Sequence, residues 1–134
     1  MNLLLDTHVL LWTLVDDERL SGKARAMIDD YDNVIFFSAA ALWEVQIKYE
    51  LHPDAIGIDA ETLRDLLEDA GFGELPVRTT HTIALGKLKK KEGTPIHRDP
   101  FDRLMIAQAK AENMILLTAD GKMQYYDEEC IEGV

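Results

Sequence analysis

The sequence predicts an α/β fold in which helices cover a mainly parallel central sheet. Short apolar runs alternate along the chain with longer segments that have helical periodicity. Within each run the apolar residues are consecutive, which is typical of strands that are buried on both faces. We therefore expect a three-layer α/β/α sandwich.

The predicted strands are the apolar runs of residues 2–6, 34–38 and 114–118, with a short additional strand at residues 75–77. Ser21 and Asp59 are good caps for helices that follow them, and Asp99 followed by Pro100 is the clearest helix start in the chain. The predicted helices cover residues 7–16, 21–31, 39–50, 59–71, 80–88 and 99–113.

Length and composition fit one globular domain over residues 1–134, with 47% hydrophobic and 29% charged residues. The first residues lack the basic start and long apolar stretch of a secretion signal, and no run reaches transmembrane length. The single cysteine, Cys130, cannot form an internal disulfide, in agreement with a reducing compartment. We expect a cytoplasmic protein that does not associate with membranes.

The net charge of −11 argues against a protein that binds a polyanion through its whole surface. The positive charge is concentrated, however, because seven of the 14 basic residues fall within residues 87–110. A solvated loop would explain such a run. Its closeness to Asp99 and Asp102 favours a role in guiding phosphate groups.

Four acidic residues lie within or at the end of hydrophobic segments, where a soluble protein normally buries apolar side chains. They are Asp6, Glu44, Asp102 and Asp120. A buried carboxylate is costly unless it is paired, hydrogen-bonded or bound to a metal. We therefore expect the four to converge on one site.

Ordinary structural roles are also available to these acids. Asp6 and Asp120 could cap the helices that follow them, and Asp102 could interact with a helix dipole from the third helical position. Glu44 is harder to explain in this way because its helical neighbours are apolar, although an exposed pair with Lys48 is possible.

Clustered carboxylates would repel one another and raise one another's pKa values, and a divalent cation would remove this repulsion. All-oxygen ligands suit Mg²⁺ or Mn²⁺, whereas the four histidines are scattered without the spacing of a zinc site. Such an ion can bind phosphate oxygens, activate water and stabilise a leaving oxygen, which is the chemistry of phosphodiester hydrolysis.

Four segments carry a family resemblance: LLLDTHVLLW, SAAALWEVQIK, HRDPFDRLMIAQA and LLTAD. In this order and spacing they resemble the motifs of PIN-domain nucleases, especially the toxins of VapBC-type toxin–antitoxin modules. The third segment is the most specific, and the resemblance spans nearly the whole chain. It implies a PIN-like α/β/α sandwich and a metal-dependent endoribonuclease that leaves a 5′ phosphate and a 3′ hydroxyl.

The resemblance also implies residue roles and partners. Catalysis and binding of Mg²⁺ or Mn²⁺ map onto Asp6, Glu44, Asp102 and Asp120. The implied partners are an RNA substrate, a cognate antitoxin and a second copy of the chain in a homodimer. Secondary site candidates are Asp99, which is better explained as a helix cap, with Ser38 and Thr118, and the candidates for contacting the substrate backbone are Arg98, Arg103, Lys89, Lys90 and Lys91.

Two other classes of protein remain as alternatives. A phospho-receiver-like signalling domain shares the α/β alternation and Mg²⁺, but it needs adjacent acids after the first strand and an aspartate after a central one. Asp6-Thr7 and Phe37-Ser38 supply neither. A catalytically silent PIN-like domain would only bind a partner, and the presence of all four acids argues against it.

Overall fold

The computed structural model describes residues 1–134 and contains one five-stranded sheet in the order β3-β2-β1-β4-β5. All four strand pairings are parallel. The predicted α/β class is confirmed, and the sheet is wholly rather than mainly parallel. The strands are β1 (Asn2–Leu5), β2 (Val34–Ser38), β3 (Gly73–Leu75), β4 (Ile115–Thr118) and β5 (Ile131–Gly133).

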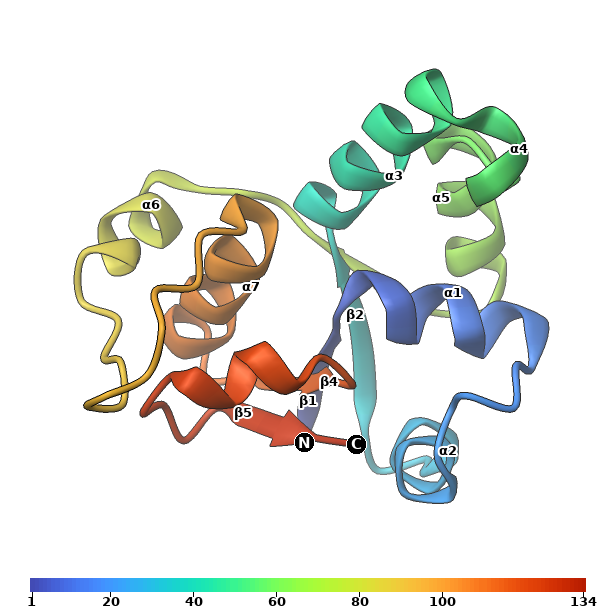
Figure 1. Cartoon of the computed structure of the whole chain (residues 1–134). Helices are drawn as coiled ribbons and strands as arrows, with labels where there is room; N and C mark the ends of the chain where they lie inside the picture. The colour runs from blue at the N-terminus through green and yellow to red at the C-terminus, as the bar shows by residue number, and fades with distance from the viewer.

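Helices lie on both sides of this sheet, with α1 and α2 on one side and α6 and α7 on the other (Figure 1). Asp6, Ser21, Asp59 and Asp99 each cap a helix by accepting hydrogen bonds from its first turn. The helices are α1 (Thr7–Val15), α2 (Gly22–Asp29), α3 (Ala39–Leu51), α4 (Pro53–Ile56), α5 (Ala60–Asp69), α6 (Thr79–Leu85), α7 (Pro100–Ala111) and the 3-10 helix η1 (Gly121–Tyr125).

Two parts of the sheet differ from the expectation. The strand predicted at residues 75–77 lies at Gly73–Leu75, because Pro76 has no N–H to donate to a sheet ladder. The edge strand β5 is an additional one, and its three residues contain only one large apolar side chain, Ile131. A run this short carries no recognisable strand pattern.

The order of the strands fixes where a ligand site can form. The chain builds β1, β2 and β3 outward in one direction, and then crosses to the other side of β1 to add β4 and β5. In open parallel sheets, ligands bind beyond the carboxyl ends of the strands where the direction reverses. Here the reversal lies between β1 and β4, so residues that follow Leu5 and Thr118 face the site.

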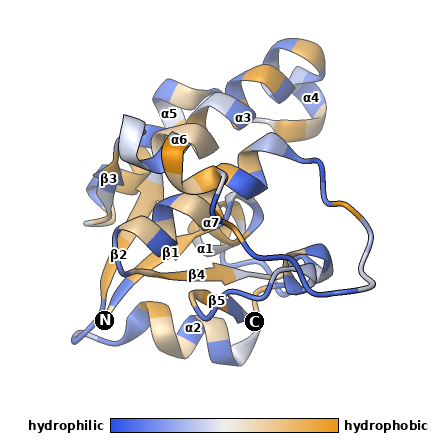
Figure 2. Ribbon diagram, turned by 90° about the vertical axis from the view of Figure 1, so that its left-hand side faces the viewer, coloured by the Kyte–Doolittle hydropathy of each residue, from blue (hydrophilic) through white to orange (hydrophobic).

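The hydrophobic core is a cluster of 22 buried residues centred on the sheet, and Leu3, Leu4 and Leu5 of β1 have no exposed surface. In Figure 2 the strands and inward helix surfaces are mainly hydrophobic, whereas the loop between α6 and α7 extends from the body and is mostly hydrophilic. None of the helices is long and apolar enough to cross a membrane.

Replacing Leu4 by alanine should destabilise the protein by about 3–5 kcal/mol, because it removes a fully buried side chain from the central strand. Urea unfolding followed by circular dichroism measures the difference. The control Leu66→Ala removes the same atoms from an exposed side chain on α5 and should change stability by less than about 1 kcal/mol. Equal losses for both variants would contradict the assignment of the core.

Candidate metal centre

Asp6 follows β1 and caps α1, with its Oδ1 accepting from the Val9 N–H at 2.9 Å. Its Oδ2 accepts a hydrogen bond from the Thr118 hydroxyl at the end of β4. Burial raises the pKa of Asp6 above its ordinary value, and the nearby Asp120 raises it further, although the Thr118 and Val9 hydrogen bonds oppose this. The capping role and a position in an acidic cluster therefore coexist.

Glu44 is buried on α3, with 7% of its surface exposed. Its Oε1 accepts from the Thr7 hydroxyl at 2.7 Å, and its Oε2 pairs with the Lys48 ammonium at 2.8 Å. The pair with Lys48 that the sequence allowed is thus present, but its acidic partner is buried rather than exposed. Thr7 directly follows Asp6, so its hydrogen bond joins α3 to the end of β1.

Asp102 lies in the first turn of α7, and its Oδ2 is 3.0 Å from Nε2 of His97. Burial of Asp102 raises its pKa to about 7, with further contributions from the negative charges of Asp99, Asp120, Glu44 and Asp6, in decreasing order. Carboxylates influence one another in this way only when they lie close together. These five acids, called the acidic cluster below, therefore lie in one region of the protein. Oxygens of Asp102 and Asp120 come within 4.8 Å of each other, and both residues line one cavity with Asp99, whereas Asp6 and Glu44 do not line it.

Asp120 and Asp99, which line one cavity with Asp102, both have structural roles as well. Oδ1 of Asp120 accepts from the Lys122 N–H at 2.9 Å and caps η1. Oδ1 of Asp99 accepts from the N–H groups of Phe101 and Asp102 at 2.9 and 3.1 Å and caps α7. Asp99 is a helix cap, as its sequence context indicated.

The two small polar candidates behave differently from each other. Thr118 donates to Asp6 and also accepts from the Asp120 N–H at 3.0 Å, so it orients two of the acidic segments. The Ser38 hydroxyl donates instead to Oε1 of Gln108 at 2.6 Å and makes no hydrogen bond to an acid. Ser38 therefore contributes to the packing of α7 on the sheet.

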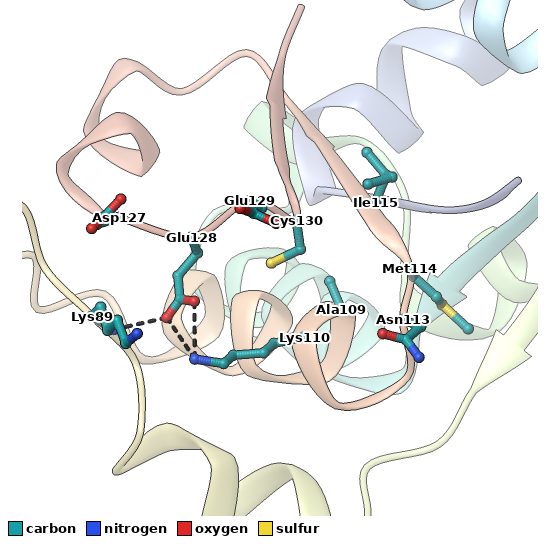
Figure 3. Close-up of a pocket in the computed structure, with 10 residues that line it drawn as sticks. All are labelled: Lys89, Ala109, Lys110, Asn113, Met114, Ile115, Asp127, Glu128, Glu129 and Cys130. Atoms are coloured by element: carbon teal, nitrogen blue, oxygen red, sulfur yellow. Dashed lines mark hydrogen bonds and ion pairs between the residues drawn. The ribbon is translucent and has the colours of Figure 1, made fainter.

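Two of the five basic candidates line cavities, and the cavities are different ones. Arg98 lines a cavity of about 420 Å³ together with Asp99, Asp102 and Asp120. Lys89 lines a larger cavity of about 570 Å³ beside the amino ends of β4 and β5, at the opposite end of these strands from the acids. Figure 3 shows Glu128 in that larger cavity, bonded to the Lys89 backbone and to the Lys110 ammonium.

The remaining basic candidates lie near the end of η1. The Lys90 ammonium donates to the carbonyl oxygen of Thr94, and the Lys91 N–H donates to the Tyr125 carbonyl at 2.7 Å. Arg103 is close enough to Tyr126 to favour its phenolate, although burial raises the pKa of Tyr126 overall. Arg98 is therefore the basic candidate that shares a cavity with Asp102 and Asp120.

Sequence reasoning missed His97, because its partner depends on how the loop before α7 folds. One ring nitrogen of His97 and one carboxylate oxygen each from Asp102 and Asp120 lie within 4.8 Å of one another. Thr7 was missed as well, since its contact with Glu44 spans 37 residues of sequence. The segment HRDPFDR, which contains His97 and Asp102, was the available signal for the first of these.

Comparison with known families gives a match to the PIN domain over residues 3–129. The chain belongs to the PIN domain family. This confirms the resemblance that the four sequence motifs indicated. Membership of the family supports a hydrolase that acts on nucleic acid.

Solved structures with a similar fold agree with the family assignment. VapBC2 of Rickettsia felis, solved bound to a DNA fragment from its promoter, superposes with a TM-score of 0.68 at 19% identity, covering 99% of this chain and 98% of the other. VapBC-1 of nontypeable Haemophilus influenzae superposes with a TM-score of 0.59 at 17% identity, covering 92% of this chain and 90% of the other. FitAcB of Neisseria gonorrhoeae superposes with a TM-score of 0.58 at 20% identity, covering 92% of this chain and 91% of the other. No curated protein matches the sequence.

The acidic cluster of this PIN domain has the chemistry of a site for a divalent cation. Among its donors, Asp6 and Glu44 are buried, and burial together with the negative charges of the other acids raises the pKa of Asp102. A cation placed among them would replace this repulsion with attraction. The residues present therefore fit such an ion.

Without a metal ion, the stability of this PIN domain should fall as the pH rises. The pKa of Asp102 is about 7 in the folded protein and 3.8 ordinarily, so between these values the folded state holds a proton that the unfolded chain releases. We expect a loss of roughly 1–2 kcal/mol between about pH 5 and about pH 8 after allowance for solvent screening. Thermal unfolding at a series of pH values in a chelating buffer measures this loss of stability.

The variant Asp102→Asn should lose most of this pH dependence because its side chain does not titrate. Asp65→Asn, at an exposed position on α5, should retain it and serves as the matched control. An unchanged pH profile in Asp102→Asn would contradict the raised pKa.

Proposed function

We propose that residues 1–134 form a single PIN nuclease domain that hydrolyses phosphodiester bonds in RNA with the help of Mg²⁺ or Mn²⁺. The observation that supports the proposal is the group formed by His97, Asp102 and Asp120, whose ligand atoms lie within 4.8 Å of one another, with Asp6 and Glu44 near enough for their charges to act on Asp102. A reaction at a phosphodiester needs a cation beside the phosphate, and this cluster is where the chain concentrates oxygen ligands.

Each residue contributes to the reaction through the group it presents. The bound ion would polarise the scissile phosphate and lower the pKa of an attacking water. The ligands of the ion would be Asp6, Glu44, Asp102 and Asp120. The hydroxyl of Thr118 holds the carboxylate of Asp6, and the hydroxyl of Thr7 holds that of Glu44. By analogy with the family, the products would carry a 5′ phosphate and a 3′ hydroxyl.

We further propose that the protein is the toxin of a toxin–antitoxin module, acts in the cytoplasm and forms a homodimer. The support is the resemblance of its motifs to VapBC-type toxins and its similarity in fold to two VapBC structures. A cognate antitoxin would inhibit it by covering the acidic site, where a basic side chain of the partner could pair with the carboxylates.

Asp6→Asn and Asp102→Asn should each reduce metal-dependent RNA cleavage by at least about 100-fold, because each removes a charged ligand. Asparagine still caps helices, so Asp6→Asn should keep the start of α1 intact. The measurement is cleavage of a labelled single-stranded RNA by purified protein with Mn²⁺, Mg²⁺ or chelator. Asp65→Asn is the exposed control and should cleave normally.

Full activity in both folded variants would refute the site. A fully folded wild-type protein that cleaves no RNA under any of these conditions, yet binds a partner protein, would instead favour the catalytically silent alternative.

Arg98→Ala should weaken binding of RNA to the inactive Asp102→Asn protein and reduce the slope of log affinity against log salt by about 0.7, the loss of one phosphate contact. Arg98 shares the cavity of the acids, whereas Lys89 lies beside the other cavity. Lys89→Ala removes the same charge and is the matched control. Equal effects from the two variants would show that only the overall charge matters.

A further inference from the structure

His97 is a buried side chain that neither the fold nor the four expected acids account for. It lies in the loop between α6 and α7, which is mostly exposed and projects from the body (Figure 2). His97 itself has only 7% of its surface exposed. Its ring packs 5.7 Å from the ring of Tyr126, whose hydroxyl donates to the His97 carbonyl at 3.4 Å. The loop therefore folds back at this residue.

The imidazole of His97 has one polar partner. Nε2 lies 3.0 Å from Oδ2 of Asp102, whereas Nδ1 is buried without a hydrogen-bond partner. A carboxylate that binds a metal ion is deprotonated, so it can only accept hydrogen bonds. The nitrogen that faces Asp102 must then carry a proton, so that the imidazole donates from Nε2.

This arrangement argues against His97 as a metal ligand itself. A histidine that binds a metal through one nitrogen normally donates the other N–H to a carboxylate, a carbonyl or water. If Nε2 bound the ion, the Nδ1 N–H would be buried without an acceptor. If Nε2 carries a proton instead, its N–H points at an acceptor, the carboxylate of Asp102.

We infer that His97 is a positioning residue that donates from Nε2 to Asp102 and thereby holds this carboxylate in the orientation that binds the metal ion. The inference rests on the proposed function, because it assumes that Asp102 is a ligand. Among side chains, His97 is the hydrogen-bond donor to Asp102. Asp6 and Glu44 receive hydroxyl donors in the corresponding way.

A pair of variants separates this donor role from simple packing. His97→Phe keeps a ring against Tyr126 but has no donor. His97→Gln loses the ring but can place an amide N–H near the position of Nε2. The readout is the Kd for Mn²⁺, measured by the signal of free Mn²⁺ in electron paramagnetic resonance. His52→Gln, at an exposed position, is the control.

We expect His97→Phe to weaken Mn²⁺ binding by about 10- to 100-fold, the usual effect of losing a partner of a metal ligand, and His97→Gln to retain most of the affinity. His52→Gln should bind like the wild type. The opposite order, with tight binding by His97→Phe and weak binding by His97→Gln, would assign His97 to packing and overturn the inference.

Pulsed electron paramagnetic resonance of Mn²⁺ bound to the wild type provides a second test. Absence of a strong coupling to a directly bound nitrogen supports the donor role, and such a coupling that disappears in His97→Gln would make His97 a ligand and overturn it. Wild-type-like binding by both His97 variants, with loss of binding in Asp102→Asn, would also overturn the inference but leave the proposed function intact. Failure of the folded wild type to bind Mn²⁺ would overturn both.

Discussion

The parallel pairing of β1 with β4 is the constraint on which the acidic site depends. The register aligns Leu5 with Leu117, so Asp6 leaves β1 level with Thr118 and accepts its hydroxyl hydrogen bond. This pair also marks the reversal of strand order, where no crossover helix covers the carboxyl ends of the strands. A site for an ion can form there because the backbone topology leaves the position open.

The acids differ in how fully hydrogen bonds and ion pairs compensate their burial. Asp6 receives a backbone N–H and a hydroxyl, and Glu44 receives a hydroxyl and an ammonium group. Asp102 has the His97 imidazole alone, and it is the acid whose pKa rises to about 7. Binding a cation would favour the deprotonated form of Asp102, which couples the first turn of α7 to the state of the site.

Sequence reasoning succeeded where a structure is determined by neighbouring residues. Asp6 and Asp99 act as helix caps, as predicted, because a cap needs only the following turn. The expectation that the four acids converge rested on their apolar surroundings and on strand ends that meet at one edge; oxygens of Asp102 and Asp120 do lie within 4.8 Å of each other. The hydroxyl partner of Glu44 and the role of His97 could not be predicted, because both depend on the packing of distant segments and on the path of a loop.

Gln108 links the C-terminal part of α7 to the sheet, because it accepts a hydrogen bond from Ser38 at 2.6 Å and donates one to the Pro76 carbonyl at 3.3 Å. The placement of α7, and with it the backbone of Asp102, is therefore set by the packed body of the protein. The loop of residues 89–99 contributes differently, because its His97 contacts the carboxylate of Asp102. The packed body of the protein thus sets the position of Asp102, whereas a residue of the loop meets the end of its side chain.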